Sequence, residues 1–282
     1  MRLKPRENPE VNQWWICDAG RYGYKLIDHN RITKPMIRKD SASVREADWE
    51  EILSEAVNQI REAQNRIGIF LSPQLSNEEL YLAKKLFQDE LECSQIFLLS
   101  PYPEGDQDDF LIRADKNPNT KGAEWLGFTS KPEDVSRFTQ SYQEGKIEGI
   151  VIFGQDLLTR WGSRVSEPIL RELKWSLFIG SNHNVTSEAS SSVLPAAAYA
   201  EKYGTFTNFQ GRVQKFNQAF EPLTESRPEW AILVELARRL GMIWAYENEE
   251  DIFNDLVRQE AAFRGLSYAK LSLQGALVNG KK

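Results

Sequence analysis

The sequence predicts an α/β fold with a doubly wound, mainly parallel sheet, an N-terminal arm and a β-hairpin. Apolar runs with the length and composition of buried strands lie at 67–71, 96–99, 150–153 and 175–179. Amphipathic helical patterns separate these runs, so that strands and helices alternate along the chain. The first two runs flank a helix predicted at 78–92, and such a βαβ unit requires parallel strands joined by a right-handed crossover.

The predicted helices are marked by their ends as well as by their periodicity. Asp48 precedes a helix that has acids in its first turn, where they favour the helix dipole. Ser76 and Glu79 have the spacing of a capping box. Gly241 stops a helix whose first turn holds a proline and whose N-cap lies near Ser226 or Arg227. The helix that Gly241 stops spans 228–240, and the remaining helical patterns lie at 135–146, 169–173 and 249–262.

Residues 1–47 do not have the pattern of a folded domain. Prolines, glycines and aromatic residues are crowded there without helical periodicity, and only 24–27 suggests a short strand. We therefore expect an N-terminal arm at 1–47 and one α/β domain at 48–282, with an optional boundary near 134. Trp14 and Trp15 predict an aromatic patch on the arm, either exposed or buried in a homodimer.

A polar hairpin follows the apolar stretch Val193–Ala198. Alternation in Thr-Phe-Thr-Asn-Phe, bracketed by two glycines, predicts two short strands, with Asn208 or Gly211 at positive φ in the turn. The polar side chains would then line one surface, where they either lock the hairpin to its own domain or hold a polar ligand. These candidate residues are Glu201, Gly204, Thr205, Asn208, Arg212 and Gln214.

Two further loops are candidate ligand sites because they directly follow predicted parallel strands. Open α/β sheets bind ligands at the carboxyl ends of their strands. The candidate residues are Gly154, Gln155 and Asp156 after one strand and Gly180, Asn182 and Thr186 after another. His183 lies in the second loop, but no serine elbow or paired cysteine accompanies it, so a surface or capping role is expected and no catalytic residue is predicted.

Asn119–Gly122 form another loop of interest. Its backbone amides could bind an anion at the start of a short helix. An Asn/Asp turn that satisfies its own polar groups is the alternative.

The composition excludes several classes of protein. A net charge of −6 and a pI near 5.3 argue against a nucleic-acid binder. No apolar run approaches the ~20 residues of a membrane helix, and 1–6 lack the apolar core of a signal peptide, so a cytoplasmic location without membrane insertion is expected. Two cysteines and two histidines are too few for a zinc site or an iron-sulfur cluster built by this chain alone, and Cys93 is expected in the core.

Three ordered motifs carry a resemblance to a known family. Leu-Pro-Ala-Ala at 194–197, Ala-Glu-Lys-Tyr-Gly-Thr-Phe-Thr-Asn at 200–208 and Gly-Arg-Val-Gln at 211–214 resemble a signature of the molybdopterin oxidoreductases. The sequence is most similar to the large iron-sulfur subunit of bacterial NADH:quinone oxidoreductase, or complex I. This resemblance implies a Rossmann-like domain.

The resemblance also concerns Cys17. Cys-Asp-Ala-Gly-Arg at 17–21 is similar to the end of the iron-sulfur subdomain, where the cysteine is the last of four thiolates on a four-iron cluster. The other three ligands would precede Met1, so Cys17 is expected to be an orphaned ligand without a cluster. From the residues alone, Cys17 is a small buried side chain between aromatic residues.

The resemblance leaves two classes of function open. In cofactor-bearing relatives the loops at 154–156 and 180–184 would hold nucleotide portions of a molybdenum cofactor, but Asn182 stands where an acid is common. We therefore expect a cofactor-free module whose partners are iron-sulfur and NADH-oxidising subunits of a respiratory complex. The alternative is a remnant site for molybdopterin guanine dinucleotide in a formate dehydrogenase-like or hydrogenase-linked oxidoreductase.

Overall fold

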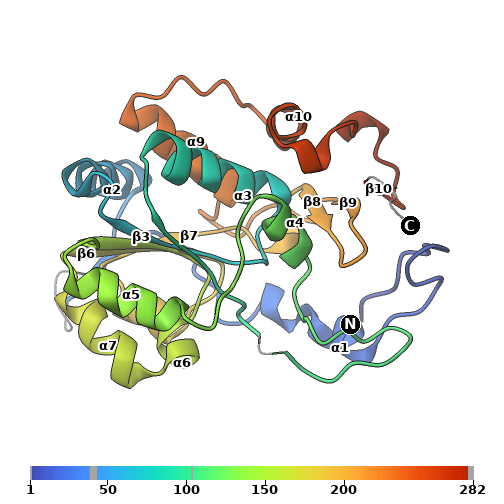
Figure 1. Ribbon diagram of the computed structural model, residues 1–282, viewed down its shortest axis with the longest axis horizontal. Coiled ribbons are helices and arrows are strands. Elements are labelled where there is room, and N and C mark those ends of the chain that lie inside the picture. The colour runs from blue at the N-terminus through green and yellow to red at the C-terminus, as the bar shows by residue number, and fades with distance from the viewer. Residues whose placement is uncertain (1, 39–42, 103, 279–282) are drawn as a thin grey trace.

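A seven-stranded sheet runs through the computed structural model, which describes residues 2–38, 43–102 and 104–278 (Figure 1). The strand order is β2-β1-β7-β6-β5-β3-β4. From β7 to β4 every neighbouring pair is parallel, whereas β1 pairs antiparallel with β7 and β2 with β1. The strands are Met36–Arg38 (β1), Val44–Glu46 (β2), Ile67–Leu71 (β3), Gln95–Leu98 (β4), Gly149–Phe153 (β5), Trp175–Gly180 (β6) and Ser192–Pro195 (β7).

The strand order confirms the predicted doubly wound α/β fold. After β3 the chain adds β4 on one side, then crosses over to add β5, β6 and β7 on the other. The point at which the winding reverses, between β3 and β5, is where such sheets open a crevice for ligands. Strands β3, β5 and β6 are buried along their whole length, which explains their continuous apolar sequences.

Helices cover both faces of the sheet, and each face has its own hydrophobic cluster (Figure 1). One layer contains α2 (Trp49–Ala63), α3 (Asn77–Ala83), α9 (Glu229–Leu240) and α10 (Glu249–Gln259). The other contains α5 (Asp134–Gln143), α6 (Leu157–Trp161), α7 (Ser163–Glu172) and α8 (Val185–Ala189). No helix in the described ranges is long and apolar enough to cross a membrane.

Most predicted helix ends are confirmed. Asp48 caps α2, and Ser76 and Glu79 form the capping box of α3. Gly241 ends α9 in the left-handed conformation, and the N-cap of that helix is Pro228, directly after Arg227. The helix predicted at 78–92 is α3 continued by a π-helix, η2 (Lys84–Glu90). The pattern at 249–262 divides into α10 and a 3-10 turn, η4 (Ala261–Phe263).

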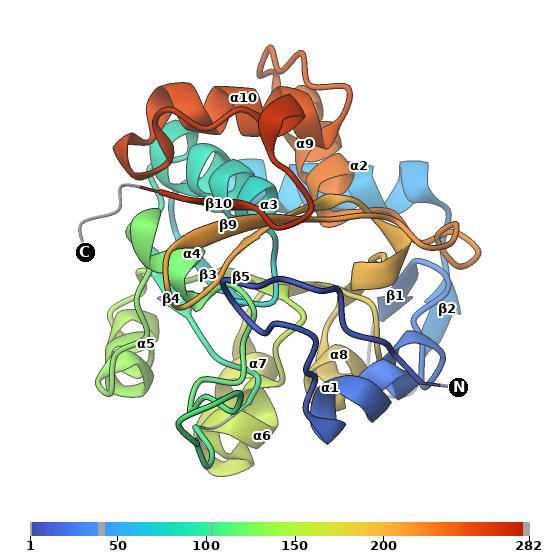
Figure 2. The same ribbon diagram turned by 90° about the vertical axis from the view of Figure 1, so that its right-hand side faces the viewer.

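A second, three-stranded sheet contains the predicted hairpin, β8 (Gly204–Thr207) and β9 (Arg212–Phe216), together with β10 (Ala276–Leu277) (Figure 2). The pairing of β8 with β9 confirms the hairpin. Gly211 takes the positive φ of the turn at +80°, whereas Asn208 does not. An added Cβ at Gly211 would lie 3.0 Å from the ring of Trp125, so close packing also requires glycine there.

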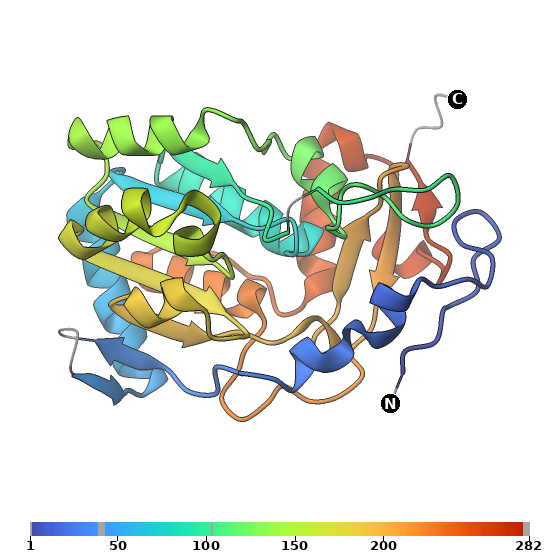
Figure 3. The same ribbon diagram turned by 90° about the horizontal axis from the view of Figure 1, so that it is seen from below.

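The N-terminal segment differs in part from the prediction. The prediction of a strand at 24–27 is wrong, because Gly23–Ile27 form a 3-10 helix, η1, after α1 (Asp18–Tyr22). Residues 36–38 and 44–46 supply β1 and β2 of the main sheet, whereas the boundary at 47 stays a prediction. Trp14 and Trp15 are 62% and 48% exposed, as expected for an arm with an exposed aromatic patch. Figure 3 shows the arm beside the hairpin at one end of the molecule.

The shorter elements complete the chain. Asn119 precedes α4 (Thr120–Trp125), and its buried amide donates to the carbonyl of Leu75 and accepts from the amide of Thr207. The structure therefore favours the self-satisfied turn at 119–122 over the anion site. The remaining turns of 3-10 helix are η3 (Tyr199–Glu201) and η5 (Tyr268–Lys270).

Candidate functional site

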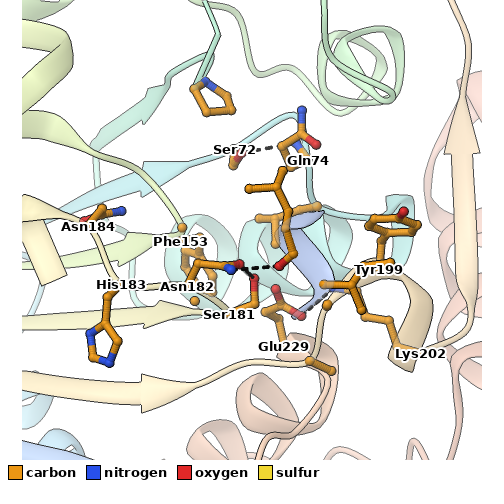
Figure 4. A pocket seen from close by; sticks show the side chains of 18 of the residues that line it. Ser72, Gln74, Phe153, Ser181, Asn182, His183, Asn184, Tyr199, Lys202 and Glu229 are labelled. Atoms are coloured by element: carbon orange, nitrogen blue, oxygen red, sulfur yellow. Dashed lines mark hydrogen bonds and ion pairs between the residues drawn. The ribbon is translucent and has the colours of Figure 1, made fainter. Parts of the chain in front are cut away.

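A cavity of about 260 Å³ lies at the carboxyl ends of β3, β5 and β6 (Figure 4). Gly154 and Gly180 form part of its wall where β5 and β6 end, and Ser72 follows β3. Gly154 has a φ of +64°, which lets the chain turn sharply after β5. The cavity is therefore at the edge of the sheet where parallel α/β folds place ligands. Its other polar lining residues are Gln74, Tyr102, Ser181, Asn182, His183, Asn184, Tyr199, Lys202 and Glu229.

Three buried charged side chains form a cluster at the floor of this cavity; Lys202 and Glu229 line the cavity, and Glu79 pairs with Lys202 without lining it. Lys202 donates to Glu79 at 2.7 Å and also to Glu229. Burial, followed by the nearby carboxylate of Glu79, raises the pKa of Glu229 to about 8. Burial lowers the pKa of Lys202, but the two carboxylates outweigh it and the pKa is raised above its usual value. The floor thus has two carboxyl groups for one ammonium, and the proton on Glu229 balances the charge near neutral pH.

A second buried ion pair joins the arm to the segment before the hairpin. Arg31 donates to both carboxylate oxygens of Glu201, at 2.9 and 2.6 Å, and to the carbonyl of Ile27. Glu201 also accepts from the amide of Ala198 at 2.7 Å. Both carboxylate oxygens of Glu201 are thus hydrogen-bonded within the chain, so this predicted site residue has a structural role.

Residues 26–32 lie along the loop that follows β6. The Asn182 amide donates to the carbonyls of Leu26 and His29 at 2.8 and 2.7 Å. The amide of His183 donates to the carbonyl of Asn30 at 2.8 Å, and the amide of Ile32 donates to the carbonyl of Ser181 at 2.9 Å. The side-chain amide of Asn182 and backbone groups of residues 181 and 183 are therefore already hydrogen-bonded to residues 26–32.

The loop after β5 is also largely self-satisfied. Gln155 is fully buried, and its amide donates to the carbonyl of Leu99 at 2.6 Å, while its oxygen has no partner in the described residues. Asp156 caps α6 and accepts from the hydroxyl of Thr186 at 3.0 Å. Of the candidate residues in this loop, only Gly154 reaches the cavity.

The hairpin residues point into other contacts. Thr205 donates to Glu78 through its amide and its hydroxyl, at 2.9 and 2.8 Å. Asn208 accepts from backbone amides within its own turn. Arg212 pairs with Glu10 of the arm. The cavity thus brings together Gly154, Gly180 and Asn182 and leaves aside Gln155, Asp156, Thr186, Glu201, Gly204, Thr205, Asn208, Arg212 and Gln214.

Glu78, next to Glu79 in α3, is a buried carboxyl group that binds the hairpin. It is completely buried, and it accepts hydrogen bonds from Thr205 without a cation among its hydrogen-bond partners in the described residues. Burial raises its pKa to about 7, although the hydrogen bonds from Thr205 oppose the shift. The sequence pattern identified Glu79 only as a helix cap and did not single out Glu78, Lys202 or Glu229. Their pairing depends on contacts between residues 27 to 127 positions apart, and no local pattern signals it.

The sulfur and imidazole groups are separate from one another. Cys17 is the N-cap of α1, where its half-buried sulfur accepts from the amide of Gly20 at 3.4 Å. Cys93 is buried as expected, and burial raises the pKa of its thiol to about 12. His183 lines the cavity, where it is half-buried. In the described part of the chain no three His, Cys, Asp or Glu residues lie where they could hold a metal ion.

Comparison with known proteins identifies the family. The family described as "Molybdopterin oxidoreductase" matches residues 31–96 and 122–239, more than half of the chain. The chain belongs to the molybdopterin oxidoreductase family. The match includes the strands that end at the cavity and the hairpin whose motifs carried the resemblance.

Relatives of known sequence are much longer than the parts that match. "Probable oxidoreductase YjgC" of Bacillus subtilis (strain 168) is 43% identical over 86 residues, which are 30% of this chain and 9% of that protein. A "Putative formate dehydrogenase" of Staphylococcus aureus (strain USA300) is 29% identical over 140 residues, 49% of this chain and 14% of that protein. The match therefore spans less than a sixth of either relative.

A solved structure shows the same fold. Acetylene hydratase from Pelobacter acetylenicus superposes with a TM-score of 0.61 over 94% of this chain and 68% of that one, at 9% sequence identity. At this identity the similarity concerns the fold alone.

Proposed function

We propose that this chain is a cofactor-free, non-catalytic module of an electron-transfer complex, of the type represented by the large iron-sulfur subunit of NADH:quinone oxidoreductase. The observation that carries the proposal is the position of residues 26–32. These residues form hydrogen bonds with the loop after β6, and they accept both bonds that the side-chain amide of Asn182 donates. In cofactor-bearing relatives this loop is expected to hold nucleotide portions of the cofactor.

The dimensions and charges of the cavity support the same proposal. Its volume of about 260 Å³ is below the roughly 300–1,000 Å³ of pockets for drug-sized ligands, and a pterin dinucleotide is larger than such ligands. A diphosphate here would also lie near Glu229, which releases its proton as the pH rises toward 8. The size and the charge of this cavity thus favour a module without molybdopterin guanine dinucleotide.

In this proposal the domain serves as a scaffold next to iron-sulfur and NADH-oxidising subunits, on the cytoplasmic side of a membrane. Cys17 then remains a helix cap in this chain and would join a cluster only if three further thiolates came from elsewhere.

Metal analysis of the purified, untagged chain tests the proposal, combined with chromatography of what heat denaturation releases. We expect less than about 0.1 equivalent of molybdenum, tungsten, iron, nucleotide or pterin per chain. A released pterin or guanine nucleotide near one equivalent would refute the cofactor-free module.

A second candidate is a cofactor-binding part of a formate dehydrogenase-like oxidoreductase. Gly154 and Gly180, at the carboxyl ends of two adjacent parallel strands, favour it because backbone can approach a ligand closely there. This candidate predicts that a guanine nucleotide at about a hundred times its Kd stabilises the fold by about 2.7 kcal/mol. An unchanged Tm at millimolar GDP would exclude it.

A further inference from the structure

Three separate segments lie together at one end of the molecule (Figure 3), and each carries exposed aromatic side chains. They are the arm, the loop at 104–116 and the turn of the hairpin. The ring of Trp15 meets Phe110 edge-on at a centroid distance of 5.9 Å, and the guanidinium of Arg113 lies 4.0 Å from the ring centroid of Phe209. We call this the arm-loop surface, and its exposed apolar residues are Trp14, Trp15, Phe110, Ile112 and Phe209.

The arm-loop surface is held in place by its own hydrogen bonds. Asp108 accepts from the amides of Phe110, Leu111 and Ile112 at 2.7 to 2.9 Å, and this turn presents Phe110 outward. The arm is fixed beneath it because Asn8 donates to the carbonyl of Gln274 at 3.0 Å. Aromatic groups that stay exposed on an ordered backbone cost little further entropy when a partner covers them.

The charge of the loop restricts the partner. Residues 104–116 carry five acids against two cations, Arg113 and Lys116. The acids Glu104, Asp106 and Asp109 are exposed and have no ion-pair partner in the described part of the chain. A twofold dimer through this surface would place each acidic loop near its copy, which costs energy. A partner with an apolar strip edged by lysine or arginine would instead match both the rings and the carboxylates.

We propose that the arm-loop surface is the docking site for a different protein, which contributes an apolar strip flanked by basic residues. This inference rests on the proposed role of the chain as a scaffold and gives that scaffold a defined face.

A helical peptide of about 18 residues, with leucine on one side and lysine on the other, can stand in for such a partner. We expect it to bind the full chain, measured by anisotropy of a labelled peptide, with an affinity that falls by about tenfold between roughly 50 and 300 mM salt. The Trp14→Ala/Phe110→Ala variant should weaken binding at least about fivefold. Asp106→Asn/Asp109→Asn should also weaken binding, chiefly at low salt.

Matched controls separate this surface from general attraction to an acidic protein. Ile243 is 99% exposed after α9, and Glu247 is exposed nearby, so Ile243→Ala and Glu247→Gln remove the same kinds of group elsewhere. They should leave the affinity unchanged. Equal weakening by the controls, binding of the matching glutamate peptide, or a dimer that Trp14→Ala/Phe110→Ala dissociates would overturn the proposal. Because cofactor content is measured separately, failure of the scaffold proposal can be distinguished from failure of the docking proposal.

Discussion

Glu78 illustrates how a single buried side chain links this fold to pH. Its ordinary pKa of 4.5 rises to about 7 in the folded chain, so the folded state holds its proton more tightly than the unfolded state does. The stabilisation is complete below pH 4.5 and is lost as the pH rises toward 7. This difference corresponds to roughly 3 kcal/mol.

Glu78→Gln should remove this dependence, because the amide oxygen still accepts from Thr205 and carries no charge. We expect wild type and Glu78→Gln to have similar free energies of unfolding at about pH 5, and the variant to be more stable at about pH 8 by up to roughly 3 kcal/mol. Urea denaturation at both pH values measures the difference. Glu62→Gln, at an exposed position of α2, is the control. A parallel pH profile for Glu78→Gln and wild type would refute the prediction.

Lys202 is the second residue on which the buried network depends. Lys202→Met leaves Glu79 and Glu229 without their cation, and loss of one partner from a buried ion pair destabilises proteins by about 3–5 kcal/mol. We expect a loss of that order in chemical denaturation, and a partial recovery when Glu229→Leu is added. Lys146→Met removes an exposed pair and should cost less than about 1 kcal/mol. Equal losses for the two lysines would contradict this view of the cavity floor.

The contact between residues 26–32 and the loop after β6 depends on the neutral amide of Asn182. Asn182→Asp would place a carboxylate 2.7 to 2.8 Å from the carbonyl oxygens of Leu26 and His29, where it repels both. We expect trypsin to cleave after Lys25 at least about fivefold faster, with a smaller change in global stability. Asn208→Asp is the control, because the Asn208 amide nitrogen has no partner in the described residues and its oxygen is retained. Unchanged cleavage after Lys25 would show that the loop does not hold this segment.

Helix α3 and the hairpin form the other contact between elements that defines the region. Asn77 and Glu78 of α3 bind Thr205 of β8, and Asn77 also accepts from Thr207. These bonds satisfy the polar side of the hairpin, so its signature residues act within the domain. The alternation that predicted the hairpin could not reveal which element it faces.

At the scale of the whole molecule, Arg137 covers part of β4, a strand at one edge of the main sheet. Arg137 of α5 donates to the carbonyl of Ile96 on β4 at 2.8 Å, and its guanidinium lies 4.2 Å from the ring centroid of Phe97. A side chain that covers an edge strand hinders edge-to-edge pairing between molecules. Arg137→Ala should therefore aggregate several times faster by light scattering at a temperature below its Tm. Arg171→Ala, on the surface of α7, should match wild type, and equal rates for both variants would sink the idea.

Local patterns in the chain were enough to predict the alternation of strands and helices, the capping box of α3, the hairpin and the family. Each of these depends on residues close together in the chain: apolar periodicity, caps, turn glycines and ordered motifs. The same patterns indicated correctly that Gly154, Gly180 and Asn182 lie at the carboxyl edge of the sheet.

How that edge is used depends on contacts that form only in the folded molecule. The pairing of Lys202 with Glu79 and Glu229, and of Arg31 with Glu201, joins distant segments through long-range packing. The placement of β1, β2 and residues 26–32 likewise depends on contacts with β7 and the loop after β6. Burial makes these contacts decisive, because a polar group removed from water must find a partner in the fold. Which partner it finds depends on how distant segments pack together, and this leaves no local pattern in the sequence.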